Sequence, residues 1–149
     1  MAEFIRTVHH VTNSDLAEVE RAFGFSFPAA FRTHYLTHNG GRPQNNLFKR
    51  DDSLYVVSEF LPIKYGRADC LFEDVFRDLK VEREVLPKHL VAFADDPGGD
   101  YYCFSVDDKD AGTIWIYRGE YSDEPDRAVQ FLAESLNEFF DNMVADEDA

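Results

Sequence analysis

Two histidines placed four residues apart are the first candidates for chemistry in this sequence. His34 and His38 would lie on one face of a helix, a spacing that can present two imidazoles to one metal ion. The zinc-protease pattern HExxH needs a glutamate directly after the first histidine, and that position is Tyr35. No third ligand is close in the sequence, so the pattern favours surface or cap histidines over a metal site.

Two Asp-rich turns, at residues 95–100 and 107–112, invite a calcium hypothesis. A loop of the type DxDxDG needs acids at alternating positions before a glycine, and neither turn keeps that register. Asp95 and Asp100 could form a carboxylate pair for acid–base chemistry. Acidic turns are common, however, and the sequence does not fix the separation of the two carboxylates.

The two cysteines are the candidate nucleophiles. A nucleophilic thiol needs a base beside it. Cys70 begins a predicted amphipathic helix and Cys103 lies within a predicted strand, and both positions are typical of packing residues. The motifs GxSxG, GxGxxG and the P-loop do not occur. We therefore predict no enzymatic activity, no metal site and no cofactor.

The charge balance indicates which partners the protein can bind. The chain has 29 acidic against 15 basic residues, for a formal net charge of −14. Between residues 95 and 126, ten acids face only Lys109 and Arg118, so this window carries −8 of the total. Such a surface repels nucleic acid and anionic membranes and favours a basic protein. The alternative interpretation is a set of solvated turns that keep the protein soluble.

A length of 149 residues and a hydrophobic share of 44% predict a single globular domain. We expect its core over about residues 14–144 and a short, frayed acidic tail over residues 145–149. No apolar run approaches the ~20 residues needed to cross a bilayer, and the first residues lack a signal-peptide pattern. Two cysteines are too few for a disulfide framework. These features predict a cytoplasmic protein with both thiols reduced.

Three short runs of aromatic and β-branched residues, at 90–94, 101–106 and 113–117, predict the centre of the fold. Each run is too short for a typical helix, and the intervals supply the Asp, Pro and Gly of tight turns. The pattern predicts a three-stranded antiparallel meander over residues 90–117, with two different faces. One face carries Tyr102, Phe104, Val106, Ile114 and Ile116, and the other carries Tyr101, Cys103, Ser105, Thr113, Trp115 and Tyr117. We expect Phe104 and Ile116 in the core.

The segments on both sides of the meander are predicted from helical spacing and from Gly and Pro stops. In chain order they are a helix that Asn13 or Ser14 caps and that runs to Phe23 with a left-handed cap at Gly24, a helix from Pro28 to Asn39, a polar loop from Arg42 to Ser53, a strand from Leu54 to Val57, an ambiguous segment from Phe60 to Gly66, a helix from Asp69 to Lys80, an acidic loop over 119–126, and a last helix from about Ala128 to Val144. Helices packed around a mostly antiparallel β-sheet define an α+β class.

Four stretches, taken in order, resemble one known family. They are DLAEVERAFG, FSFPAAFRTHYLTHNGG, LVAFADDPGGDYYCFSVDD with GTIWIYRGE, and FLAESLNEFF. Their order is similar to that of the SUKH superfamily, the Smi/Knr-like domain, over roughly Leu16 to Phe140. The usual Leu-Pro before the second helix is Phe27-Pro28 here, a departure that should leave the helix start intact.

The resemblance implies a SUKH-like α+β fold and a role in binding rather than catalysis. The superfamily includes a fungal cell-wall synthesis regulator and many bacterial immunity proteins of polymorphic toxin systems. The expected function is therefore a non-enzymatic immunity protein that binds and neutralises a cognate toxin domain, with a basic nuclease as one candidate. The alternative is an intracellular scaffold or regulatory module of the fungal type. The positions that match the family are structural, namely Pro28, Gly40, Gly41, Gly98 and Gly99.

The expected contact surface joins the first acidic turn to the second face of the meander. Its residues are Asp95, Asp96, Asp100, Tyr101, Trp115 and Tyr117. Buried aromatic side chains anchor interfaces, and charges at the rim mainly raise the association rate. Because consecutive turns of a meander lie at opposite ends of its strands, a partner at the first turn need not touch the second. The alternative is that the protein's own helices cover this face, with Trp115 in the core. The sequence does not indicate an oligomeric state.

Overall fold

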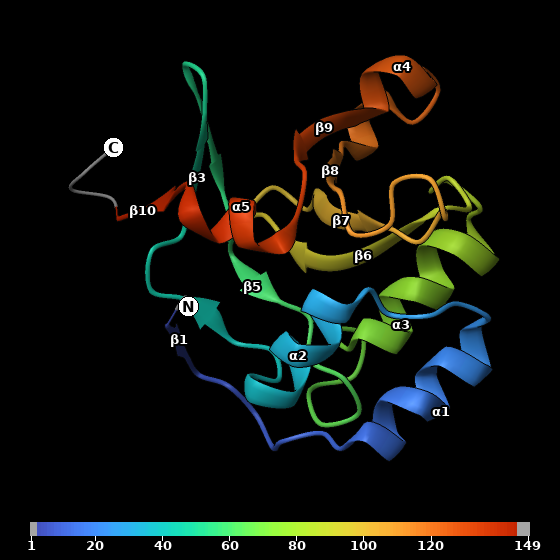
Figure 1. Ribbon diagram of the computed structural model, residues 1–149. Coiled ribbons are helices and arrows are strands. Elements are labelled where there is room, and N and C mark those ends of the chain that lie inside the picture. Colours follow the sequence, from blue (N-terminus) through green and yellow to red (C-terminus); the bar gives the residue numbers. More distant parts are fainter. Residues whose placement is uncertain (1–2, 146–149) are drawn as a thin grey trace.

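A five-stranded antiparallel sheet forms the centre of the protein, whose computed structural model describes residues 3–145 (Figure 1). Its strands, in spatial order, are β5 (Glu59–Phe60), β6 (Leu90–Asp95), β7 (Tyr101–Ser105), β8 (Ile114–Tyr117) and β9 (Val129–Ala133). Strands β6, β7 and β8 confirm the predicted meander, and the helices around them confirm the α+β class. Of the predicted acidic tail, residues 146–149 lie outside the described residues.

Short strands and helices surround this sheet. The strands are β1 (Phe4–Ile5), β2 (Arg42–Pro43), β3 (Leu47–Arg50), β4 (Ser53–Val56) and β10 (Met143–Val144). The helices are α1 (Asn13–Phe23), α2 (Ala29–Thr37), α3 (Phe72–Phe76), the π-helix η1 (Arg77–Glu82), the 3₁₀-helix η2 (Gly119–Tyr121), α4 (Pro125–Ala128) and α5 (Leu136–Asp141). Strand β1 pairs with β2, and β3 pairs with both β10 and β4.

Strand register gives the central sheet the two faces expected from the alternation. Tyr102 lies opposite Ile116, and on the other face Cys103 lies opposite Trp115. Phe104 and Ile116 are both buried, which confirms that they belong to the core. The assignment of side chains to faces was therefore correct.

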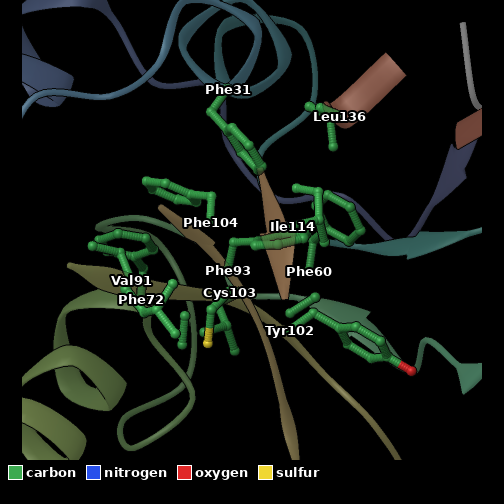
Figure 2. Packing of buried hydrophobic residues seen from close by; sticks show 14 of the residues in the cluster. Phe31, Phe60, Phe72, Val91, Phe93, Tyr102, Cys103, Phe104, Ile114 and Leu136 are labelled. Carbon is green, nitrogen blue, oxygen red and sulfur yellow. The ribbon is translucent and has the colours of Figure 1, made fainter. Parts of the chain in front are cut away.

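Aromatic rings fill the layer above the first face (Figure 2). The ring of Phe31, from α2, lies 4.3 Å from that of Phe104 and 4.9 Å from that of Phe93, measured between centroids. Phe139, from α5, approaches Phe93 and Tyr102 at 6.0 Å and 5.9 Å. Helices α2 and α5 therefore cover the same face of the sheet.

The predicted polar loop from Arg42 to Ser53 is wrong, because this segment forms β2 and the first strand of the β3–β4 hairpin. Leu47 and Phe48 are buried, and the Phe48 ring stacks on Phe139 with centroids 4.7 Å apart. Asp51, at φ 54°, helps to close the tight turn between the strands. A hairpin anchored by so few apolar residues leaves little periodicity in the sequence.

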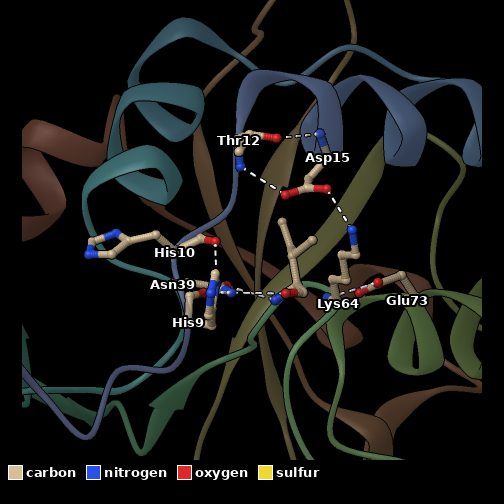
Figure 3. A network of polar contacts seen from close by, with 8 residues as sticks. His9, His10, Thr12, Asp15, Asn39, Lys64 and Glu73 are labelled. Carbon is tan, nitrogen blue, oxygen red and sulfur yellow. Dashed lines mark hydrogen bonds and ion pairs between the residues drawn. The ribbon is translucent and has the colours of Figure 1, made fainter.

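Helix α1 is capped by Thr12 rather than by Asn13 or Ser14. The Thr12 hydroxyl accepts a hydrogen bond from the Asp15 backbone N–H at 3.1 Å, and the Asp15 carboxylate accepts one from the Thr12 backbone N–H at 2.9 Å (Figure 3). This reciprocal pair is a capping box. Gly24, at φ 74°, confirms the predicted left-handed cap at the other end.

Asn39 follows α2 and connects two distant segments of the chain to it. Its amide nitrogen donates to the carbonyl oxygens of His9 and Ile63, both at 2.9 Å (Figure 3). Its amide oxygen accepts a hydrogen bond from the Ile63 backbone N–H at 2.8 Å. The buried side chain is thus fully used, which offsets the cost of removing it from water.

The predicted helix from Asp69 to Lys80 begins at Phe72 and continues as the π-helix η1. Its apolar stripe is buried, as expected. The Lys80 ammonium donates to the carbonyl oxygens of Lys88 and Leu90, both at 2.7 Å. These bonds fasten η1 to the start of β6.

The predicted helix from Ala128 to Val144 is wrong, because this segment contains β9, α5 and β10. β9 pairs with the edge of β8, and the Trp115 ring meets that of Phe131 edge to face at 5.4 Å. Ser135 then starts α5 by accepting a hydrogen bond from the Glu138 backbone N–H. The apolar residues fit helical spacing, but pairing with an open strand edge satisfies the backbone of residues 129–133 instead.

Candidate protein-binding surface

The turn between β6 and β7 is held by the side chain of Asp96. Its Oδ1 atom accepts hydrogen bonds from the backbone N–H groups of Gly98, at 2.9 Å, and Asp100, at 2.8 Å. Gly99 adopts φ 93°, a conformation that favours glycine, and donates its N–H to the Asp96 carbonyl. Pro97, Gly98 and Gly99 are exposed at the tip. The Asp96 carboxylate therefore fixes the shape of the turn and also contributes negative charge to it.

Hydrogen bonds join this turn to two other segments of the chain. The Asp95 carboxylate accepts from the Glu59 backbone N–H at 3.1 Å, and the Asp100 carboxylate accepts from the Gly119 backbone N–H, also at 3.1 Å. The start of β5, the β6–β7 turn and the segment after β8 therefore meet at one end of the sheet. We call this surface the acidic end and define it by Glu59, Asp95, Asp96, Asp100 and Glu120. The acidic window suggested Glu120, whereas Glu59 lies 36 residues before Asp95 and gave no signal.

Burial and neighbouring carboxylates raise the pKa values of Asp95 and Asp100. Burial raises the pKa of Asp95 to about 6, and the nearby charges of Glu59 and Asp96 act in the same direction. Burial also raises the pKa of Asp100, with further contributions from Asp96 and Glu120. Mutual repulsion of this kind requires short separations, so the surface carries a concentrated negative field.

The three predicted aromatic contacts lie at different depths. Tyr101 is half-buried and lies opposite Tyr117, which is buried. Asp95 raises the pKa of Tyr101 and Asp100 raises that of Tyr117, in both cases after the larger effect of burial. Trp115 lies further along β8. The structure therefore gathers the three aspartates and the two tyrosines at the acidic end and leaves Trp115 apart.

The protein's own chain partly covers the second face of the sheet. Arg83, which follows η1, acts electrostatically on both Tyr101 and Tyr117. Trp115 is half-buried, and its indole N–H donates to the Thr113 hydroxyl at 2.9 Å. Trp115 is thus neither a fully buried core residue nor a freely exposed anchor.

The second acidic turn lies at the opposite end of β7, and its side chains are used within the turn. Asp110 accepts a hydrogen bond from the Ser105 hydroxyl, and Asp107 accepts one from the Lys109 backbone N–H at 3.1 Å. Asp107 and Asp108 are exposed. This turn does not add its charge to the acidic end.

The other candidates for chemistry are dispersed. His34 is buried, and its ring centroid lies 5.8 Å from that of His38. Within residues 3–145, no cluster of three or more His, Cys, Asp or Glu side chains is placed to hold a metal ion. Cys70 is exposed and Cys103 is buried, and both are free thiols. No helix in the same residue range has the length and apolar character needed to cross a membrane.

Comparisons with known proteins place this fold in a family. A crystal structure of a protein from Pseudomonas syringae pv. tomato matches with a TM-score of 0.51 and 15% sequence identity, over 78% of this chain and 74% of that chain. At that identity the match shows a shared fold alone. No curated protein matches the sequence. The sequence profile of the SMI1/KNR4 family (SUKH-1) matches residues 10–142, nearly the whole described chain, and the protein therefore belongs to that family.

Proposed function

We propose that this protein is an immunity protein that binds a basic toxin domain through the acidic end and blocks it. The observation that carries the proposal is the convergence of carboxylates from three separate chain segments on one end of the sheet. A domain of this family indicates protein-partner binding in general. The sign and concentration of the charge select a basic partner.

The mechanism is electrostatic capture followed by steric block. A nuclease holds phosphate with basic side chains, and an acidic inhibitor uses the same field to reach the same surface. The exposed tip formed by Pro97, Gly98 and Gly99 lets the turn enter a cleft without displacing bulky side chains. Because the turn is held by its own hydrogen bonds, little order has to be gained on binding.

The proposed contacts are Asp95, Asp96, Asp100 and Tyr101, with Trp115 at the margin. Tyr101 is half-buried, so a partner can cover its remaining surface. Tyr117 is buried and supports Tyr101 from across the strand pair. Aromatic groups that are already rigid anchor an interface at low entropic cost.

The test compares two variants that remove equal charge from different places. The first replaces Asp95, Asp96 and Asp100 with Asn, and the matched control replaces the exposed Asp51, Asp52 and Asp108 with Asn. Asparagine keeps an oxygen that accepts the hydrogen bonds of the turn. The binding partner used in this test is the small C-terminal domain of any large secreted protein encoded beside this gene.

The first variant should associate with the toxin domain roughly tenfold more slowly at low salt, and the difference should shrink as salt rises. The control should associate nearly as fast as the wild type, and cells that express it should remain protected. Equal association rates for both variants would contradict the proposed contact surface. Slower association of the control alone would also contradict it, and would direct the search to the segment from Arg42 to Asp52.

The alternative function is an intracellular scaffold or regulatory module that binds a basic protein of the same cell. The acidic end suits either partner. Affinity capture from cells that lack any toxin gene separates the two functions. A stoichiometric endogenous partner, lost in the Asp95, Asp96, Asp100 variant, would favour the scaffold. No such partner, together with protection against the toxin, would favour the immunity protein.

A further inference from the structure

Helices α2 and α5 contact each other over the first face of the sheet (Figure 1). Side chains from both helices line a groove. The groove has a volume of about 880 Å³. Residues close to the N-terminus, of the β2–β3 connection and of β10 complete its lining. Its lining includes Glu3, His34, Leu136, Phe140, Asp141 and Met143. The size suits a side chain or a small ligand.

The lining combines an apolar wall with acceptor groups of one charge sign. Phe140, Leu136 and Met143 supply the apolar surface, and the amides contribute carbonyl oxygens. Among residues 3–145, the charged side chains in the lining are those of Glu3 and Asp141, and none is a lysine or arginine. A ligand that complements this lining is a cation carried on an apolar chain.

His34 supplies a separate observation that points to a ligand. Its side chain is 4% exposed, and its Nε2 atom is buried without a hydrogen-bond partner among residues 3–145. Burial, with a smaller effect from His38, lowers the pKa of His34 to about 3, so the imidazole is neutral at physiological pH. A buried polar atom that lacks a partner calls for an explanation. A neutral imidazole nitrogen can accept a hydrogen bond from a ligand N–H group.

Aromatic rings surround this imidazole. The Phe140 ring centroid lies 5.5 Å from that of His34, and the Phe4 and Phe60 centroids lie 4.9 Å and 5.0 Å away. These rings hold the imidazole in place, and His34 also contributes to the lining of the groove. A planar cation can stack on the face of Phe140 while its N–H groups meet the acceptors.

We propose that the α2–α5 groove binds the side chain of an arginine from a partner polypeptide. The guanidinium lies between Glu3 and Asp141, one N–H reaches toward His34, and the methylene stem runs along Phe140 and Leu136. Arginine fits better than lysine because its donors form a flat fork that meets several acceptors at once. The groove is separate from the acidic end, and this inference does not require that the partner be a toxin.

A peptide titration tests the site without knowledge of the partner. Acetyl-Gly-Arg-Gly-amide is added to the ¹⁵N-labelled protein of 149 residues, and amide shifts are followed by NMR. The control is the same peptide with citrulline in place of arginine, which keeps the shape and removes the charge. The arginine peptide should shift the amides of residues 136–141 and of His34, and the citrulline peptide should leave them unchanged.

Substitutions in the groove test which side chains bind the arginine peptide. Replacing Glu3 and Asp141 with Gln and Asn should weaken the arginine peptide at least about fivefold. A matched variant that replaces the exposed Asp123 and Asp126 with Asn removes the same charge elsewhere and should bind like the wild type. His34→Phe keeps an aromatic ring and should also weaken binding. If His34→Phe does not fold, the variant with Glu3 and Asp141 replaced still tests the site, because both side chains are exposed.

Three results would overturn the inference. They are equal binding of the arginine and citrulline peptides, shifts confined to residues 95–100 and 118–121, and unchanged binding by the Glu3, Asp141 variant. A lysine peptide that binds as tightly as the arginine peptide would overturn the assignment of a guanidinium.

Discussion

The acidic end and the α2–α5 groove show two different ways in which one small fold presents negative surface. The acidic end carries many carboxylates on an exposed turn, and its polar groups are bonded to backbone within the turn or to neighbouring segments. The groove carries few charges around a buried imidazole whose Nε2 is unbonded. The exposed and half-buried carboxylates of the acidic end act over a Debye length and attract any basic partner, whereas a buried imidazole acts only at contact and can distinguish one functional group from another.

The largest effect should come from the core that both regions share. Phe104 lies under α2 and within the meander that carries the acidic turn. Phe104→Ala should reduce the free energy of unfolding by about 3–5 kcal/mol, because it opens a cavity at a fully buried site. Urea denaturation followed by circular dichroism gives the value. A loss below ~0.5 kcal/mol would show that the two regions do not rest on a common core.

The buried imidazole of the groove should make the stability of the protein sensitive to acid. The folded-state pKa of His34, about 3, lies below the ordinary value of 6.5, so its stabilising contribution is present above pH 6.5 and is lost as pH falls toward 3. Between pH 7 and pH 5 this amounts to about 2 kcal/mol. In His34→Phe that part of the acid sensitivity should vanish. Unfolding free energies of both proteins at the two pH values provide the comparison, and identical pH dependence would contradict the buried neutral imidazole.

The turn at the acidic end should depend on an oxygen at position 96 rather than on a charge. Asp96→Ala removes the acceptor of two backbone N–H groups and should cost about 1 kcal/mol of stability. Asp96→Asn keeps an acceptor and should stay close to the wild type. Thermal unfolding of the two variants side by side measures the difference. Equal destabilisation of both would mean that the charge itself holds the turn.

The smallest effect should come from Asp95, and its sign is opposite to that of His34. The folded-state pKa, about 6, is raised, so this group favours folding below its unfolded value of 3.8 and loses that contribution as pH rises through 6. The wild type should therefore gain stability from Asp95 between pH 7 and pH 5, and Asp95→Asn should gain less. Chemical denaturation at both pH values is the measurement. A larger gain in the variant would exclude a raised pKa.

The sequence predicted the parts of the fold whose signal is local. The runs at 90–94, 101–106 and 113–117 are apolar, too short for a helix and separated by Asp, Gly and Pro, and the period of two in the second and third runs sets the two faces, so the meander follows from local rules. Helix α1 was also predictable to within one or two residues, because Gly24 marks its end. Residues 129–133 were misread because their apolar spacing suits a helix, and only the open edge of β8 makes them a strand.

The candidate sites divide in the same way. Asp95, Asp96 and Asp100 could be found from sequence because they share one turn. Glu59 joins them only through the pairing of β5 with β6, a contact between distant segments. The groove was not predictable, because its lining comes from both ends of the chain and from α2. The His34–His38 spacing drew attention to His34, which lines the groove, but it gave no sign of the groove itself.

The bare tip of the first turn offers an attachment point for a reporter. A Cβ atom added at Gly98 would meet only the Asp96 carboxylate, at 3.5 Å, whereas Gly99 adopts a backbone conformation that other residues rarely accept. A fluorophore coupled to Gly98→Cys, in a chain whose exposed Cys70 has been replaced by Ser, would sit at the centre of the acidic end without displacing the core. Its emission would register an arriving protein directly, so the search for partners can begin as an optical screen.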